Sequence, residues 1–90
     1  MRARPGHRDD VVAILLESVT GLRELGCSVY SVSVSDDDPD VIWVHEVWDG
    51  KDSHAASLQL PETRAAIGRA MPMLTGEFTS QETIVKGGLP

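Results

Sequence analysis

The sequence has little of what marks disulfide-stabilised, membrane-spanning or nucleic-acid-binding proteins. Its 90 residues include one cysteine, Cys27, so no disulfide can close within the chain, which fits a reducing cytoplasm. No apolar run approaches the ~18 residues of a membrane span, and the charged residues 1–4 are not followed by the apolar stretch of a signal peptide. Eight basic residues against fourteen acidic ones leave a net charge of −6 and no basic stripe. We therefore expect a cytoplasmic protein that binds neither a membrane nor a nucleic acid.

Aromatic residues are also scarce, at 4% of the chain, and both tryptophans, Trp43 and Trp48, lie in one apolar run. The hydrophobic fraction of 41% is that of a globular protein, and residues 1–90 are expected to form a single domain. A domain of this size buries roughly 60–65% of the surface that its unfolded chain exposes. Its core is therefore small, and a partner subunit would add to it.

Apolar spacing and turn residues predict an alternation of helices and strands. In chain order we expect a helix at 8–24, strands at 27–35 and 41–48, a helix at 51–59, a helix from 61 to about 73, a strand at 79–85 and a tail at 86–90. The apolar stripe of the first helix comprises Val12, Leu15, Leu16, Val19 and Leu22, and that of the third comprises Ile67, Ala70, Met71 and Leu74. Gly26 suits the end of the first helix, Pro61 the start of the third, and Pro72 a kink or end near Met73.

This order lacks a first strand. A split β-α-β-β-α-β fold needs a strand before the first helix, and only Met1 to Arg4 remain to supply it. Either this strand is a stub or the chain as given begins inside it, and we favour the second interpretation. The predicted class is α+β, ferredoxin-like, with a truncated first strand.

The two central strands differ in the polarity of their faces. In the first, Tyr30, Val32 and Val34 share one face, opposite the serines at 31, 33 and 35. In the second, Ile42, Val44 and Trp48 oppose Val41, Trp43 and Val47, so both faces are apolar. Because helices of so short a chain cover one face only, the other face predicts contact with a second subunit. We expect a homodimer.

The end of the second strand carries polar groups among these apolar side chains. His45 shares a face with Trp43, and Glu46 shares the other with Trp48. A buried carboxylate needs partners, and so does an indole N–H. One pair should therefore face a cleft beneath the helices and the other a subunit interface, but strand alternation alone does not decide which.

Several short segments together resemble the antibiotic biosynthesis monooxygenase (ABM) family, and within it the quinol monooxygenases. They are Pro5-Gly6-His7-Arg8-Asp9-Asp10, Gly26-Cys27-Ser28-Val29-Tyr30, Asp38-Pro39-Asp40, Glu46-Val47-Trp48, Ser53-His54-Ala55-Ala56-Ser57-Leu58 with Pro61, and Ala70-Met71-Pro72-Met73-Leu74. The resemblance implies a ferredoxin-like fold that dimerises into an α+β barrel. In several members it implies oxygenation of quinols or polycyclic phenols by dioxygen, without metal or flavin.

His54 is the first-choice catalytic residue. On a helix it shares a face with Ser57, and its imidazole can take a proton from a phenolic hydroxyl near neutral pH. Glu46 and His45 are the further catalytic candidates. We assign substrate binding to Ser57 and to three aromatic residues, Trp43, Trp48 and Tyr30.

Neither a metal nor another cofactor is expected. His45-Glu46 begins like a zinc-binding His-Glu-x-x-His motif, but Asp49 stands at the fifth position and the segment is strand-like. The acidic turn at 36–40 lacks the glycine and the closing glutamate of a calcium loop. Haem-degrading members of the family carry a Trp and a His where Ser57 and Ile67 align.

The sequence therefore predicts a cofactor-independent monooxygenase that acts on a quinol or polycyclic phenol. Two alternatives stay open: a non-catalytic dimer that binds an aromatic metabolite, and a cofactor-free isomerase of a small polar ligand. A cleft lined by Arg64 and Arg69 would favour a phosphorylated ligand over an aromatic one. Glu46 could also be a structural partner of either arginine.

Overall fold

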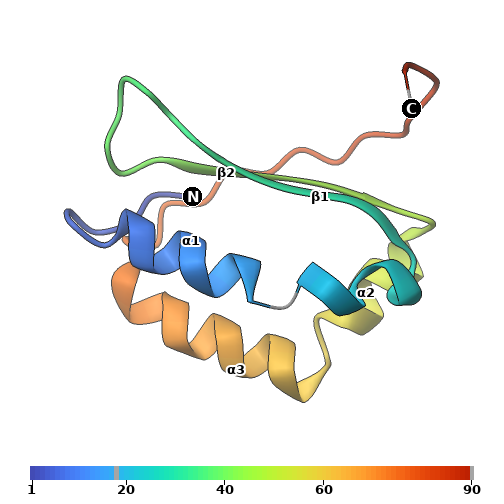
Figure 1. The fold of residues 1–90 in the computed structure, drawn as a ribbon, viewed down its shortest axis with the longest axis horizontal. Helices are drawn as coiled ribbons and strands as arrows, with labels where there is room; N and C mark the ends of the chain where they lie inside the picture. The colour runs from blue at the N-terminus through green and yellow to red at the C-terminus, as the bar shows by residue number, and fades with distance from the viewer. Residues whose placement is uncertain (18, 90) are drawn as a thin grey trace.

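The computed structural model describes residues 1–17 and 19–89, which form two layers. The helices are α1 (Arg8–Leu16), α2 (Lys51–Ser57) and α3 (Pro61–Ala70), and the strands are β1 (Cys27–Val34) and β2 (Ile42–Trp48). Short 3-10 turns lie at Val19–Gly21, Arg23–Leu25 and Met71–Met73. Figure 1 shows that all three helices lie on the same side of the two-stranded sheet. Among the described residues, no helix has the length and apolarity to cross a membrane.

β1 and β2 form an antiparallel hairpin, as the sequence predicts. Val32 pairs with Val44 and Tyr30 with Glu46, with one irregularity between Cys27 and Val29. Ile42 is fully buried against the helices, whereas its neighbour Trp43 is exposed on the opposite face. The α+β class is therefore confirmed, and the helices cover one face of the hairpin.

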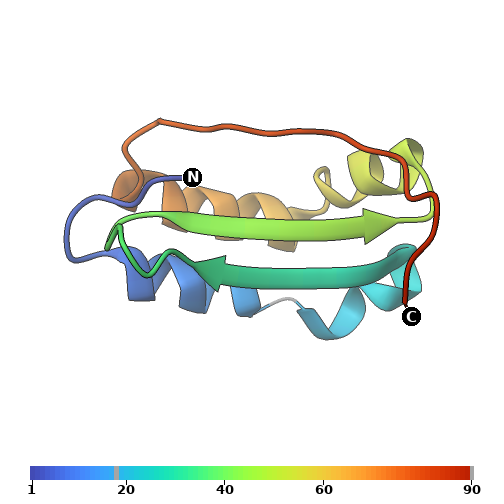
Figure 2. The same ribbon diagram turned by 90° about the horizontal axis from the view of Figure 1, so that it is seen from above.

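Residues 1–4 lie beside β2 and extend the sheet by a short stub. Arg2 forms a β-bridge with Val41, and Ala3 forms one with Leu74, both antiparallel. The N-terminal residues thus lie between β2 and the start of the C-terminal segment (Figure 2). The spatial order, β1, β2, residues 2–3, residue 74, is consistent with a ferredoxin-like sheet whose first and last strands are reduced to single bridges.

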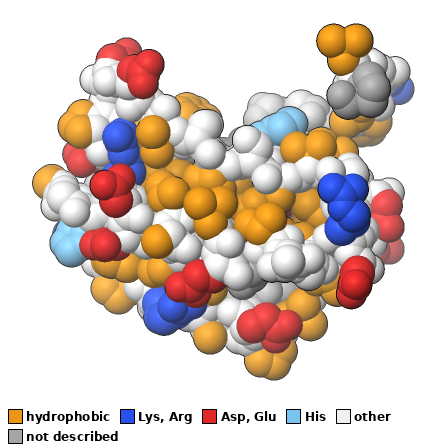
Figure 3. Space-filling model, in the orientation of Figure 1, with side chains coloured by type: hydrophobic (Ala, Val, Ile, Leu, Met, Phe, Trp, Pro, Cys, Tyr) orange, Lys and Arg blue, Asp and Glu red, His pale blue; other side chains and the backbone are white. Residues whose placement is uncertain are grey.

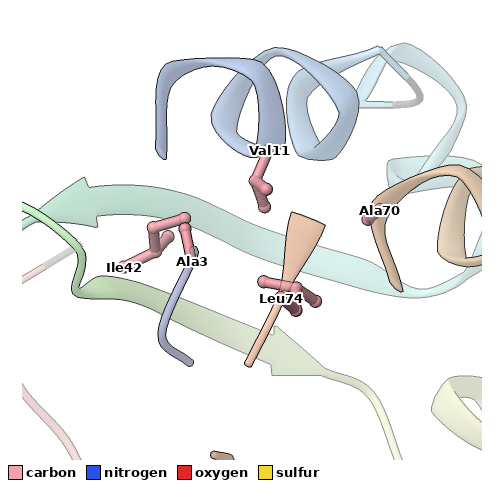
Figure 4. Close-up of a cluster of buried hydrophobic side chains, with 5 residues drawn as sticks. All are labelled: Ala3, Val11, Ile42, Ala70 and Leu74. Atoms are coloured by element: carbon pink, nitrogen blue, oxygen red, sulfur yellow. The ribbon is translucent and has the colours of Figure 1, made fainter. Parts of the chain in front are cut away.

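The core is small and draws on every part of the fold. Figure 4 shows its five buried side chains, which are Ala3, Val11, Ile42, Ala70 and Leu74. Each comes from a different segment: the stub, α1, β2, α3 and the turn that follows α3. Because each segment supplies a single buried residue, none of them can bury its apolar face alone.

Arg2 and Arg8 bind the hairpin turn to the N-terminal segment. The Arg2 guanidinium donates two hydrogen bonds to the Asp38 carboxylate, at 2.9 and 3.2 Å, and a third to Glu77 at 3.0 Å. Arg8 donates to the backbone carbonyl oxygens of Ser35, at 3.0 Å, and Asp38, at 2.9 Å. The hydrogen bonds from Arg2 hold the pKa of the Asp38 carboxyl below its usual range. These bonds connect the turn, the stub and the C-terminal segment.

The first helix is shorter than the spacing predicts. α1 ends at Leu16, and two 3-10 turns replace its expected continuation to Glu24, with Ser18 outside the described residues. Val19, Thr20 and Gly21 are poor helix formers, which accounts for the tighter turns. The buried residue of α1 is Val11, whereas Leu16 of the predicted stripe is 50% exposed.

The predicted strand at 79–85 is wrong. This segment has no regular secondary structure, and its backbone forms no backbone hydrogen bond with the described residues. The contact of this segment with the rest of the chain is instead between side chains, in the ion pair of Glu82 with Lys51 at 3.4 Å. The other predicted elements stand with small changes: α2 ends at Ser57, α3 starts at Pro61, and Pro72 lies in the 3-10 turn that ends α3.

Substitution of Gly26 by alanine should destabilise the fold. Gly26 has φ 106°, and an added Cβ would lie 2.7 Å from both carboxylate oxygens of Asp49. The left-handed backbone alone costs an L-residue about 1–2 kcal/mol, and Asp49 must also move. We expect urea denaturation to report at least this loss. The control is Gly68→Ala, in open space within α3, which should raise stability by about 0.5–1 kcal/mol. Equal effects from both variants would contradict the strain at Gly26.

Candidate functional site

A cavity of about 440 Å³ lies between the helix-facing side of the sheet and the helices. Most of its lining is apolar, with residues from both strands, all three helices and the C-terminal segment. Its polar side chains gather where β2 meets α2. They are Tyr30, Glu46, Trp48, His54 and Ser57, with Thr63 further along. Figure 3 shows hydrophobic side chains gathered between sheet and helices on the face in view, with charged side chains around them.

Glu46, Trp48 and His54 form one contacting cluster. The Trp48 indole donates a hydrogen bond to Glu46 Oε1 at 3.2 Å, and His54 Nε2 lies 3.9 Å from the same oxygen. The Trp48 and His54 rings have their centroids 5.2 Å apart, inclined at 31°. The side chains of His54 and Glu46 are 40% and 29% exposed, so the pair is partly desolvated but open to a ligand.

Local sequence accounts for this geometry. Strand alternation puts Glu46 and Trp48 on the same face of β2, two residues apart. Gly50 then takes an extended conformation and starts α2, whose residue 54 lies one turn inside the helix. Ser57 is buried, and its hydroxyl donates to the His54 carbonyl oxygen at 2.7 Å. Ser57 therefore holds the backbone of α2 at His54 while it lines the cavity.

Tyr30 brings a hydroxyl to the same end of the cavity from β1. It is the cross-strand partner of Glu46. Burial raises the pKa of the Tyr30 phenol, and the negative charge of Glu46 raises it further. Tyr30 is thus kept in its neutral form, as a hydrogen-bond donor, above its ordinary titration range.

The structure separates the two pairs of β2 residues that sequence alone left equivalent. Glu46 and Trp48 face the helices, and Trp43 and His45 lie exposed on the opposite face, outside the cavity lining. Five of the predicted site residues therefore meet: Tyr30, Glu46, Trp48, His54 and Ser57. The other two, Trp43 and His45, share a surface with the serines of β1.

Several cavity residues were not predicted as site residues. Ile67 and Met71, assigned to a buried stripe of α3, are 44% and 48% exposed and point into the open cavity. Phe78 reaches the cavity from the C-terminal segment. The only signal for Phe78 in the sequence is an isolated aromatic residue within a polar stretch.

The arginines of α3 take no part in this site. Arg69 forms a bidentate ion pair with Glu17, and neither Arg64 nor Arg69 is among the residues that line the cavity. Their proposed pairing with Glu46 is therefore wrong. Within the described part of the chain, no three His, Cys, Asp or Glu side chains are grouped so as to hold a metal ion.

This arrangement suits proton transfer from a flat apolar ligand. The His54 imidazole lies beside the Glu46 carboxylate, whose position the Trp48 indole fixes, and an imidazole can accept a proton from a ligand hydroxyl. Nε2 faces Glu46, and Nδ1 makes no hydrogen bond with the described residues. The long apolar remainder of the cavity fits hydrocarbon or aromatic surface.

Comparisons with known proteins agree with these features. The family model for antibiotic biosynthesis monooxygenase matches residues 1–69. A crystal structure from Chloroflexus aurantiacus J-10-fl, described as a candidate antibiotic biosynthesis monooxygenase, superposes with a TM-score of 0.90 at 42% sequence identity. The match covers 100% of this chain and 90% of that one. No curated protein matches the chain.

The titration of Tyr30 offers a direct test of this electrostatic arrangement. Tyr30 is the only tyrosine, so ultraviolet absorbance of the phenolate reports it alone. We expect its pKa above the ordinary value of about 10. Glu46→Gln should lower this pKa, but not fully to the ordinary value, because burial is the larger cause. Asp49→Asn is the control and should leave the midpoint unchanged. An unchanged midpoint in Glu46→Gln would place the carboxylate away from Tyr30.

Proposed function

The chain belongs to the antibiotic biosynthesis monooxygenase family, and on this premise we propose that it oxygenates a quinol or polycyclic phenol with dioxygen. The reaction needs no metal or organic cofactor in this proposal, since the substrate itself reduces dioxygen. The observation that carries it is the His54–Glu46 pair, 3.9 Å apart, at the polar end of an otherwise apolar cavity.

The first step is the removal of a phenolic proton by His54. The resulting imidazolium is stabilised by the carboxylate of Glu46, whose position is held by the Trp48 indole. The Tyr30 hydroxyl, kept neutral, can donate a hydrogen bond to a second oxygen of the substrate. Apolar residues such as Ile67 and Met71 would contact the flat ring and exclude water from the anion.

The electron-rich anion then reacts with dioxygen at a ring carbon. One oxygen atom forms a bond to this carbon, and the other leaves as water after the O–O bond breaks. A hydroquinone thereby loses four electrons and becomes a hydroxyquinone, and one dioxygen accepts all four. The hydrogen atoms of the water come from the substrate, so no external reductant enters the balance.

The residues that line the cavity also bear on the two alternative functions, an isomerase and a non-catalytic binder. An isomerase of a phosphorylated ligand would need cations at the site, and the arginines of α3 lie elsewhere. A non-catalytic binder of an aromatic metabolite needs only the apolar wall. The imidazole of His54 beside the carboxylate of Glu46, at the polar end of an apolar cavity, favours chemistry over binding alone, because polar groups are costly to place there without a use.

We further propose that the outer face of the sheet is the homodimer interface. This face carries Trp43, which is 56% exposed, together with Val29 and the serines of β1. The helices lie on the other side, and the hairpin turn and the C-terminal segment rise at its two ends (Figure 1). The small serines allow close approach of a second sheet, and Trp43 supplies apolar area to bury.

Substitution of His54 tests the catalytic proposal. His54→Ala should lower quinol-dependent oxygen uptake by about 10²–10⁴-fold, the usual effect of losing a general base. His45→Ala, on the outer face, is the matched control and should retain activity. Ligand binding, followed by tryptophan fluorescence, should persist in His54→Ala. Oxygen uptake that is absent in the unaltered protein, despite tight quinol binding, would favour the non-catalytic binder.

Substitution of Trp43 tests the dimer. Sedimentation at micromolar concentration should give about twice the chain mass of 9.7 kDa. Trp43→Glu should shift the protein towards the monomer, because it places a charge in the apolar interface. Leu25→Glu, an exposed apolar residue in a 3-10 turn away from this face, is the control and should stay dimeric. A monomeric unaltered protein would overturn the proposed interface.

A further inference from the structure

One wall of the cavity is a single stripe of side chains along α3. Its members recur three and four residues apart, so they lie on one side of the helix. They are Thr63, Ala66, Ile67, Ala70 and, in the turn that follows, Met71. From Thr63 to Ala70 the stripe is about 10 Å long, at the usual rise of a helix. Only its first member, Thr63, has a polar side chain, so the rest of this wall is apolar.

The wall that β2 supplies changes polarity along its length in the same sense. Val44, Glu46 and Trp48 line the cavity in this order, over about 13 Å at the usual rise of a strand. α2 joins the end of β2 to the start of α3, so α3 runs back along the helix side of the sheet (Figure 1). Glu46, Trp48 and Thr63 therefore lie towards the α2 end of the cavity, the polar end. Val44 and Met71 lie towards the other, the apolar end.

The aromatic side chains of the two strands lie at the polar end. The ring centroids of Trp48 and His54 are 5.2 Å apart, and Tyr30 is the cross-strand neighbour of Glu46. A flat ring gains most beside another ring, whereas methionine adapts its shape to an irregular or flexible neighbour. The polar end therefore suits an aromatic ring. The apolar end suits an aliphatic chain, because its large side chains include Ile14, Ile67, Met71 and Leu74.

We propose that the substrate is a phenol or quinol with a hydrocarbon side chain, and that this chain lies along the α3 stripe towards Met71. The inference rests on the proposed function, from which it takes the substrate hydroxyl beside His54. The ring then lies next to Trp48 and Tyr30. A chain on the ring carbon opposite the hydroxyl leads from this position into the apolar end, where it takes the place of further fused rings.

The polarity of the two ends fixes this orientation. A hydroxyl at the apolar end would lose its hydrogen bonds to water, and none of the described residues that line this end has a polar side chain. Each methylene of the chain that is buried against the stripe strengthens binding by about fourfold. Chain length therefore controls affinity, up to the length at which the chain passes Met71.

Binding of 4-alkylphenols, from 4-methylphenol to 4-heptylphenol, tests the proposal. Titration calorimetry without dioxygen measures Kd alone, so the result is independent of turnover. We expect Kd to fall by about fourfold with each of the first added methylenes and then to level off. The matched control is 2-heptylphenol, which has the same composition but carries its chain beside the hydroxyl. It should bind about tenfold more weakly than 4-heptylphenol. A Kd that is independent of chain length, or equal for the two isomers, would overturn the proposal.

A fused-ring compound distinguishes a chain from a polycycle. Tighter binding of 2-hydroxyanthracene than of 4-heptylphenol would assign the apolar end to fused rings, with Phe78 of the lining as an aromatic neighbour, and would overturn the proposal. The oxygenation is tested separately. Affinity that rises along the 4-alkylphenol series, in a protein without quinol-dependent oxygen uptake, would refute the oxygenation and support the ligand class.

The variant Met71→Gln locates the chain. It places an amide in the path of the chain and should weaken binding of 4-heptylphenol by about tenfold. Binding of 4-methylphenol should weaken much less, because the shorter ligand does not reach residue 71. Leu16→Gln is the matched control and should leave both affinities unchanged, because Leu16 is 50% exposed, like Met71 at 48%, but does not line the cavity. An equal loss for both ligands in Met71→Gln would contradict the proposed path of the chain.

Discussion

Backbone pairing between β1 and β2 decides which side chains enter the cavity. With Val32 opposite Val44 and Tyr30 opposite Glu46, the even-numbered residues of β2 face the helices. Ile42 then enters the core, and Glu46 and Trp48 reach α2. A slip of one residue would exchange this set for Trp43, His45 and Val47 and would remove the carboxylate from His54. The core and the candidate site thus depend on the same register.

The helices place the remaining side chains of the site over the face of β2 that the strand register selects. α2 follows β2 after two residues, Asp49 and the extended Gly50, so His54 is brought back over the face that carries Glu46 and Trp48. α3 contributes Ala70 to the core and turns Ile67 towards the open cavity, and Met71 in the 3-10 turn that follows also lines it. The same shortage of covering elements that keeps the core small leaves this cavity accessible to a ligand.

Residues 1–4 and the C-terminal segment lie beside β2 but form only short stretches of sheet with it and with each other. Residues 1–4 form backbone hydrogen bonds with Ile42 but not with the later residues of β2. Ion pairs, and not a ladder of backbone hydrogen bonds, hold the C-terminal segment beyond them. The segment predicted as a strand at 79–85 forms no backbone hydrogen bond with the described residues. The composition of this segment suits a strand, but a strand forms only where a neighbour supplies hydrogen-bonding groups.

Local patterns in the sequence determined the hairpin, the start of α3 at Pro61, the end near Pro72 and the residues of the polar cluster. These features depend on neighbours within a few positions: alternation in strands, helical spacing, and the backbone limits of proline and glycine. Only the tertiary structure decided that Glu46 and Trp48, not His45 and Trp43, meet His54. That choice depends on which face the helices cover, and contacts between distant segments set it, such as Ala3 with Leu74 and Arg2 with Asp38. Alternation along a strand defines two faces but carries no information about which of them is covered.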